Sequence, residues 1–169
     1  LGRKTAEQYH KALKEYLPDA FRDSYLAETA PLMGVRESRR IKGKYTLTLE
    51  DYVSRRSFSD EIARNSYWLD CHPSGNGEKT IQVNPDDNYK KGDSHGIPFR
   101  CLIPENISNL LVAGRCISVE RIVLSSTRVM PNCLATGEAA GIAATLAIKE
   151  NTDVCNISGE QVMEIIKSN

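Results

Sequence analysis

Residues 109–144 read NLLVAGRCISVERIVLSSTRVMPNCLATGEAAGIAA, and four kinds of sequence follow one another in this stretch. The apolar run 110–113 predicts a short strand covered on both faces, and Gly114 predicts that it stops where backbone approaches another group closely. A polar loop is expected at 125–128. Small residues then predict a helix that begins near Asn132.

A helix that starts beside a glycine turn can hold a ligand. Its first backbone N–H groups are unpaired and its dipole is positive at that end, which suits an anionic or electron-rich cofactor. Gly137 and Gly141 lie four residues apart and would let the helix lie very close to a sheet or to that ligand. Tight packing alone explains the two glycines equally well.

The chain has 169 residues and 40% hydrophobic content, which is enough for a core and fits one domain or two incomplete ones. Its 22 basic and 22 acidic residues cancel, so charge gives no support for nucleic acid or an anionic membrane as a partner. No stretch approaches the ~20 apolar residues of a membrane span. We therefore expect no nucleic-acid partner and no membrane partner.

The five cysteines are odd in number and widely spaced, which indicates neither a closed disulfide framework nor a CxxC metal site. Free thiols in a reducing compartment are expected, which favours the cytoplasm. The chain begins at Leu1 without an initiating Met, so we expect a piece of a longer protein, and a lost leader would leave the compartment open. The cysteines are Cys71, Cys101, Cys116, Cys133 and Cys155.

Elsewhere, apolar spacing predicts further helices and strands. Ser158 is the expected N-cap of the last helix, with Gln161 at the third position of a capping box. Together these elements indicate an α+β or α/β fold. Helices are expected at 5–17, from residue 49, around 58–63 and at 158–166, and strands at 45–49, 66–72, 80–83 and 95–103.

Three arginines, Arg36, Arg39 and Arg40, lie within five positions. Guanidinium groups bind carboxylate or phosphate in a planar, bidentate manner, so Arg36 and Arg40 are candidates for binding an anionic substrate. The alternative is a solvated basic turn whose arginines pair with Glu37 and Glu50.

An acid/base group is predicted near the end of the strand at 66–72. Alternate residues of a strand share a face, so the Asp70 carboxylate could orient the imidazole of His72. The alternative is that His72 ends the strand and touches solvent. Arg100 lies inside the strand at 95–103 and needs either a partner or an exposed face, and it is a third candidate for binding substrate.

Four motifs, in order along the sequence, support a family resemblance that covers most of the chain. Together they resemble the C-terminal part of bacterial FAD-dependent oxidoreductases whose flavin domain is of the glutathione-reductase type. The motifs are GVRESRRIKGKYTLTLEDY at 34–52, YWLDCH at 67–72, IPFRCLIPENISNLLVAGRCIS at 97–118 and STRVMPNCLATGEAAGIAA at 126–144.

The resemblance implies that the LLVAGR segment returns to the FAD domain and approaches the ribityl chain or the pyrophosphate. It also implies that the RVMPNC segment faces the flavin ring, where backbone amides near Asn132 and Cys133 stabilise negative charge on the reduced isoalloxazine. The cofactor-binding residues are then Gly114, Arg115, Arg128, Val129, Met130, Asn132 and Cys133.

Two features depart from this family. The wider flavoprotein class often has an acidic residue after the strand glycine to hold the ribityl chain, whereas this chain has Arg115, which could contact phosphate instead. No G-x-G-x-x-G follows any predicted strand, so the cradle for adenosine and pyrophosphate is absent. We therefore expect the missing N-terminal FAD-binding portion of the same chain as a partner. Without it, this piece is expected to be inactive and to lack FAD.

The expected domains are a portion at 1–105 that belongs mainly to the substrate domain, a C-terminal segment of the FAD-binding domain at 106–152, and a C-terminal helix at 153–169. The expected reaction is transfer of a hydride or electrons between FAD and an unidentified organic small molecule, with His72 as acid/base.

Two alternatives from other classes stay open. One is a non-catalytic ligand-binding or protein-interaction domain, in which the small-residue helix packs against a partner. The other is thiol redox or metal chemistry at Cys71, His72 and Cys133, which requires these groups to lie within bonding reach of one another.

Overall fold

The computed structural model describes residues 2–32, 34–71 and 89–168. In this part of the chain, helices combine with a small two-stranded sheet, so the predicted α+β class is confirmed. The chain divides into two compact units, Leu1–Val35 and Arg36–Asn169, and each is described by itself. This division does not test the domain boundaries expected from the sequence, which stay a prediction.

The first unit contains helix α1 (Gly2–Tyr16) and the short helix α2 (Pro18–Phe21). Helix α1 confirms the helix predicted at 5–17, although it begins three residues earlier. Every residue of α1 keeps some exposure to solvent. His10 shares a hydrogen bond of 3.0 Å with the Ser24 hydroxyl, so it packs against the turn that follows α2.

The second unit holds an antiparallel pair of strands, β1 (Glu61–Asn65) and β2 (His95–Pro98). Ala63 lies opposite Ile97, and the register shifts between Glu61 and Ala63, as in a bulge. All four residues of β2 are buried, so β2 lies in the core, whereas β1 is only partly buried.

Strand β1 overturns two predictions. The turn of helix expected around 58–63 is wrong because pairing with β2 draws this segment into a sheet, and long-range pairing overrides a local helical signal. The strand predicted at 66–72 is wrong over 66–71. Its aromatic residues stay outside the core: Tyr67 stacks on Trp68, and Trp68 is 55% exposed. The strand expected at 80–83 lies outside the described residues.

The strand predicted at 95–103 is confirmed only in its first half. After Pro98 the backbone turns into the 3-10 helix η2 (Phe99–Leu102). The apolar residues of η2 are still buried, so the alternation that predicted a strand reflected burial rather than strand pairing. A continuous apolar run cannot by itself separate these two structures.

The strand predicted at 110–113 is also wrong. No strand is assigned over this run, although the Val112 N–H donates to the Leu102 carbonyl at 2.8 Å. Within the part of the chain that the structure describes, no strand pairs with it along its length. The loop expected at 125–128 is wrong as well, because helix α4 (Arg121–Thr127) occupies that segment.

The strand predicted at 45–49 is reduced to an isolated bridge between Leu47 and Val119. Leu49 instead begins helix α3 (Leu49–Val53), which confirms the short helix expected there. Thr48 and Asp51 form a capping box at its start, with the Asp51 N–H donating to Thr48 Oγ1 at 3.2 Å.

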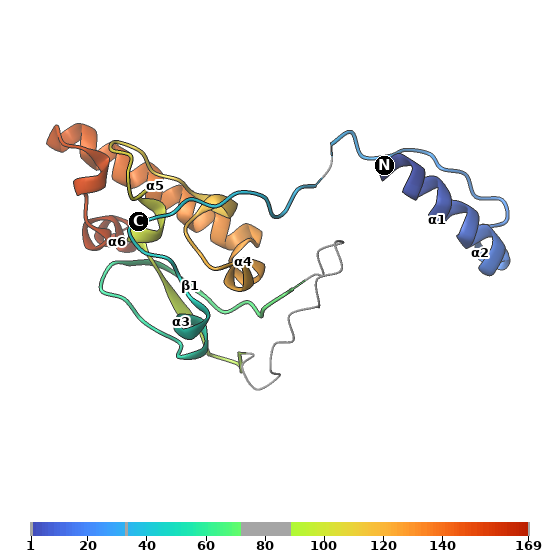
Figure 1. Ribbon diagram of the computed structural model, residues 1–169, viewed down its shortest axis with the longest axis horizontal. Helices are drawn as coiled ribbons and strands as arrows, with labels where there is room; N and C mark the ends of the chain where they lie inside the picture. Colours follow the sequence, from blue (N-terminus) through green and yellow to red (C-terminus); the bar gives the residue numbers. More distant parts are fainter. Residues whose placement is uncertain (1, 33, 72–88, 169) are drawn as a thin grey trace. The chain divides into compact units, whose positions relative to one another are not determined.

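Helix α5 (Met130–Glu150) confirms the helix predicted from near Asn132. Helix α6 (Gly159–Ser168) follows, and its predicted capping box is confirmed: the Gln161 N–H donates to Ser158 Oγ at 3.2 Å. Helix α5 packs against β1 and α6 (Figure 1). Of the helices in the described segments, none is both long and apolar enough to cross a membrane.

The buried positions of α5 recur every three or four residues and therefore form one stripe along the helix. Two of them are polar and lie near its start, and the remaining three are alanines, whose small side chains allow a close approach to the core. The five positions are Asn132, Thr136, Ala139, Ala143 and Ala147.

Candidate functional site

The site forms where the 3-10 turn η3 (Gly114–Cys116) meets the start of α5. Gly114 has φ +75°, a left-handed conformation that favours glycine. Its N–H donates to Thr136 Oγ1 at 3.0 Å, and a Cβ added at Gly114 would lie 3.9 Å from Cys133 Sγ. The glycine therefore stops the extended run directly against the first turns of the helix, as the sequence predicts.

The backbone carbonyl of Arg128 joins this turn to the helix start. It accepts a hydrogen bond from Arg115 Nε at 3.1 Å and a weaker one from Cys133 Sγ at 3.7 Å. Arg115 itself is exposed, so the rest of its guanidinium is accessible. Residues expected to bind one cofactor thus come together from two separate segments of the chain.

The side chain of Arg128 points inward and is only 6% exposed. Its Nη1 lies 3.1 Å from Glu37 Oε2, and its Nη2 donates to the Asp70 carbonyl at 2.8 Å. Because this guanidinium is already held by two groups, Arg128 contributes to the site mainly by tying three segments together.

The side chain of Asn132 is also turned into the protein. Its Nδ2 donates to Asn65 Oδ1 at 2.9 Å, and Asn65 Nδ2 donates in turn to Ser126 Oγ at 2.7 Å. These three residues are buried and come from α5, β1 and α4. Since buried amides are costly to leave unpaired, this network fixes how the helix start sits on the sheet.

The outer side of the helix start is open. Val129 is the N-cap, and no side chain among the described residues caps the first turn. Pro131 has no N–H, while the Cys133 N–H bonds to the Val129 carbonyl at 3.2 Å. Met130 is 73% exposed. The N-cap side chain therefore supplies no acceptor for the first-turn amides of this 21-residue helix, and the exposed Met130 stands at its start.

The arginine-rich segment runs beside this site. The Ile41 N–H donates to the Cys116 carbonyl at 2.9 Å. This bond places the preceding residue, Arg40, close in space to the η3 turn. Glu37 bridges Arg121 and Arg128, at 3.2 and 3.1 Å. The predicted pairing of Glu37 with its neighbouring arginines is therefore replaced by pairing with the α4 helix and its C-terminal end.

Arg36 and Arg39 are exposed in the same segment, and Arg40 is partly buried. Arg100 lies apart from them. It forms a bidentate ion pair with Asp60, at 2.9 and 3.1 Å, and its guanidinium stacks over the Tyr45 ring at 5.1 Å. This hydrogen bond to Asp60 raises the pKa of Arg100. The structure thus does not group Arg100 with the other two substrate candidates.

The predicted acid/base residue, His72, lies outside the described residues. Its expected neighbour Asp70 is described, and its carboxylate Oδ2 lies 3.8 Å from Arg128 Nη2. Asp70 therefore lies next to the site, where Arg128 contacts both its carbonyl and its carboxylate.

Comparison with protein families matches residues 1–166 to the family described as FAD dependent oxidoreductase. The chain belongs to this family. FAD is accordingly the cofactor of this family, and its chemistry is that of an oxidoreductase. No curated protein and no solved structure matches the chain.

The η3 turn and the α5 start fit part of an FAD site of this oxidoreductase family. A left-handed glycine allows close backbone approach, an uncapped helix start offers N–H donors, and Arg115 offers an accessible cation. The residues that would hold the cofactor here are Gly114, Arg115, Met130 and Asn132, the last two through their backbone N–H groups.

Among the described residues, the thiols of Cys71 and Cys133 contact different groups, while His72, the third member of the alternative redox or metal site, lies outside them. Cys71 Sγ donates to Ser125 Oγ at 3.3 Å, whereas Cys133 Sγ contacts the Arg128 carbonyl. Burial raises the pKa of the Cys101 thiol to about 12, so this group stays protonated. All five cysteines are free, and the residues that the structure describes contain no cluster of three metal-type side chains.

Sequence reasoning missed three residues of this site, namely Asn65, Ser126 and Thr136. Thr136 follows Asn132 by one helical turn, a spacing that places the two on one face of α5, and this signal could have been used. Asn65 and Ser126 had no such signal, because their role depends on β1 and α4 meeting beneath the helix.

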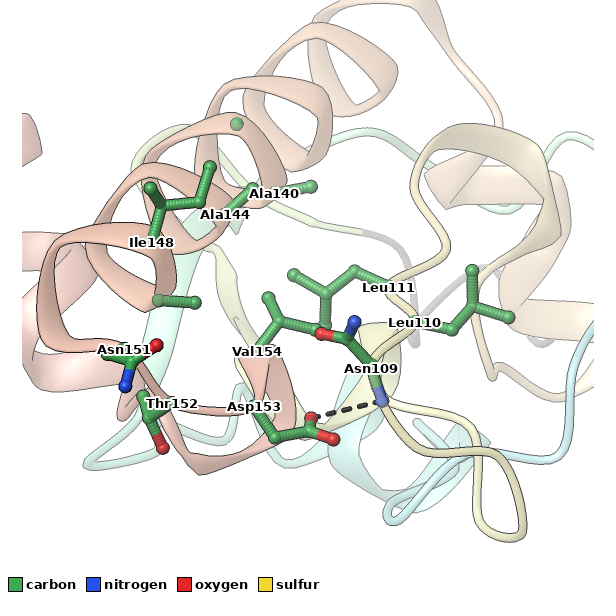
Figure 2. A pocket seen from close by; sticks show the side chains of 12 residues that line it. Asn109, Leu110, Leu111, Ala140, Ala144, Ile148, Asn151, Thr152, Asp153 and Val154 are labelled. Carbon is green, nitrogen blue, oxygen red and sulfur yellow. Dashed lines mark hydrogen bonds between the residues drawn. The ribbon is translucent and has the colours of Figure 1, made fainter.

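A second surface lies further along α5. A groove of about 1000 Å³ separates the helix from the segment around Leu110 and Leu111. Figure 2 shows Ala140, Ala144 and Ile148 on the helix side of this groove, across from the two leucines. The groove therefore has apolar walls on these two sides, and Asn109, Asn151, Thr152 and Asp153 add polar groups to its lining.

Two glycines open onto this outer face of α5. Gly137 and Gly141 are exposed, and no atom of the described chain lies within 4 Å of the place where a Cβ would stand. The close packing predicted at these glycines is therefore not made by the described residues. The buried stripe of alanines makes the contact with the core instead.

Proposed function

We propose that the η3 turn and the α5 start form the flavin-facing edge of an FAD site of the glutathione-reductase type in a bacterial oxidoreductase. The protein would transfer a hydride or electrons between FAD and an organic small molecule. One observation carries this proposal: the left-handed Gly114 and the uncapped helix start are joined through Thr136 and the Arg128 carbonyl.

Bound FAD supplies the redox chemistry, and the protein supplies position and charge. The backbone N–H groups of Met130 and Asn132 and the positive end of the α5 dipole would favour negative charge on the flavin. Arg115 donates from Nε to the Arg128 carbonyl, and its two Nη groups would donate to a phosphate oxygen.

On the substrate side, we propose Arg36 and Arg40 as anion-binding groups and His72 as acid/base. The segment that contains Arg36 and Arg40 is held beside the site by the bond from the Ile41 N–H to the Cys116 carbonyl. Arg100 would first have to leave Asp60 in order to bind a substrate, so its part in binding is the weakest of the three arginines.

We propose further that the groove along α5 is covered by the FAD-binding portion that carries the G-x-G-x-x-G motif. The groove and the site share one helix and one segment of the chain, because the lining residues Asn109 to Leu111 lie three residues before Gly114 at the nearest and the rest of the lining includes α5. The FAD site would then be complete only with that portion in place.

The test uses the whole protein that contains this chain, purified without added cofactor, with bound FAD measured by visible absorbance. Gly114→Ala is compared with Gly92→Ala, since Gly92 is also left-handed, at φ +97°; an added Cβ would meet no atom within 4 Å there and would make only ordinary van der Waals contact with Cys133 at Gly114. Both variants carry similar backbone strain. We expect Gly114→Ala to weaken FAD binding about tenfold, equivalent to about 1.4 kcal/mol, and Gly92→Ala to leave it unchanged.

A colourless protein that takes up no FAD would contradict the proposal and favour the non-catalytic interaction domain instead. Equal loss of FAD in the two glycine variants would remove Gly114 and the η3 turn from the site while leaving the oxidoreductase assignment intact.

A further inference from the structure

Thr136 lies one turn into α5 and is 1% exposed. Its Oγ1 donates to the Asn132 carbonyl at 2.7 Å and accepts the Gly114 N–H at 3.0 Å. The same oxygen also lies 3.2 Å from the Cys133 carbonyl. One hydroxyl therefore contacts the glycine turn and the carbonyls of two first-turn residues, one of which, Asn132, is among those proposed to hold FAD.

We infer that Thr136 is a positioning residue that sets the spacing between the Gly114 turn and the start of α5. This inference rests on the proposed FAD site, and it adds a residue that touches no cofactor itself. Thr136 acts through the Gly114 amide, whose direction is restricted by the left-handed φ of +75°.

The hydroxyl group is needed because it donates and accepts at once. A threonine within a helix can donate to the carbonyl four residues earlier, and its lone pairs remain free for a second group. Valine has the same shape but neither function. With valine, the Gly114 N–H would lose its acceptor and face a methyl group.

When the bond from the Gly114 N–H to Thr136 Oγ1 is lost, the η3 turn should move and the α5 start should stay in place. Asn132 is held from below by Asn65, so the helix start keeps its anchor on the sheet. On the other side, Gly114 leads directly to Arg115, which reaches the Arg128 carbonyl through a single bond from its Nε. Releasing Gly114 would thus loosen Arg115 as well.

The experiment compares three variants of the whole protein: Thr136→Val, Thr136→Ser and Thr127→Val. Serine keeps the hydroxyl and tests rescue. Thr127 is the control for losing a buried hydroxyl, because it is 2% exposed and donates to the Val123 carbonyl at 3.3 Å within α4. The measurements are the FAD dissociation constant, the flavin reduction potential and hydrogen exchange at the Gly114 amide.

For Thr136→Val we expect FAD binding to weaken about fivefold to tenfold, the Gly114 amide to exchange faster by a similar factor, and the potential to shift. Thr136→Ser and Thr127→Val should stay within about twofold of the wild type. If Thr136→Val and Thr127→Val bind flavin and change all three measured quantities equally, the positioning role of Thr136 is overturned, while the proposed FAD site is not.

A wild-type protein without flavin would overturn the proposed function, which is a separate result. If Thr136→Val does not fold, the wild type and Thr136→Ser decide by exchange at Gly114. A slow amide in both supports the contact, and a fast amide in the wild type refutes it.

Discussion

At its start, helix α5 is tied into the chain by polar side chains, whereas its outer face further along has no partner among the described residues. Asn132 and Thr136 are buried and hydrogen-bonded to β1 and to the Gly114 turn. Gly141 and Ile148 lie on the open groove, with Ile148 81% exposed. One helix therefore combines a closed region and an open region.

The difference shows that small residues on a helix can serve two surfaces at once. The alanines of the buried stripe bring α5 close to its own core, and the glycines of the outer face leave room for something else. Composition alone cannot separate the two roles, because both faces contain residues of similar size. The following predictions test this contrast in order of expected effect.

The largest effect is expected when the same substitution is made on each face. Ala143 is fully buried and Ala144 is exposed on the groove. Ala143→Leu should lower the free energy of unfolding by about 3 kcal/mol, because three added carbons overpack the core, and Ala144→Leu by less than about 0.5 kcal/mol. Urea unfolding measures both, and equal losses would contradict the assignment of the two faces.

Protonation of the buried His95 should lower the free energy of unfolding. His95 in β2 has no exposed surface; its Nδ1 shares a hydrogen bond with the Tyr89 hydroxyl, and its Nε2 has no partner in the described chain. Burial, with a smaller effect from Arg64, lowers the pKa of His95 from 6.5 to about 4.

Because the unfolded chain binds this proton more readily, the stability that neutral His95 provides is present above pH 6.5 and is lost as pH falls toward 4. The loss should be on the order of 2–3 kcal/mol. Unfolding free energies measured across this range should show a slope that His95→Gln removes. An unchanged slope in that variant would mean that other groups titrate, whereas Ala144→Leu should leave the slope as it is.

A smaller effect is expected at the ion pairs that tie down the α5 start. Glu37→Gln should cost about 1 kcal/mol, because it removes charge from the bridge to the buried Arg128. Glu105→Gln is the control, since its partner Lys42 is 81% exposed and such surface pairs contribute little. Thermal unfolding that ranks the two variants in the opposite order would argue against a tethered helix start.

The smallest effect should have the opposite sign. Gly141→Ala should stabilise the chain by about 0.5–1 kcal/mol, because alanine favours helix and open space surrounds this glycine. If the FAD-binding portion covers the groove closely, the same substitution should weaken its association. Stabilisation together with unchanged association would mean that nothing approaches the helix at Gly141.

Several elements could be predicted from local sequence. Helix α6 follows from Ser158 and Gln161, whose capping box closes within four residues, and α5 follows from Pro131 and the small residues after it. Gly114 marks the stop of the extended run because its left-handed φ is a property of the backbone at one position. These signals involve residues close in sequence, so the chain carries them without its fold.

The strands and the site network could not be predicted in the same way. Strand β1 depends on pairing with β2 some thirty residues later in the chain, and the apolar run at 110–113 has no such strand partner among the described residues. Asn65 meets Asn132 across 67 positions. No spacing within either segment indicates that contact, because it depends on how β1 and α5 pack.

The sequence alone therefore determined helices α5 and α6, the glycine turn and the resemblance to an FAD-dependent oxidoreductase, since each depends on short-range order or on motifs. Tertiary structure alone decided that Arg128 points inward, that Arg100 belongs to Asp60 and that Thr136 holds Gly114. Hydrogen bonds and ion pairs form between whichever groups folding brings within about 3 Å, and that proximity is a property of the packed chain.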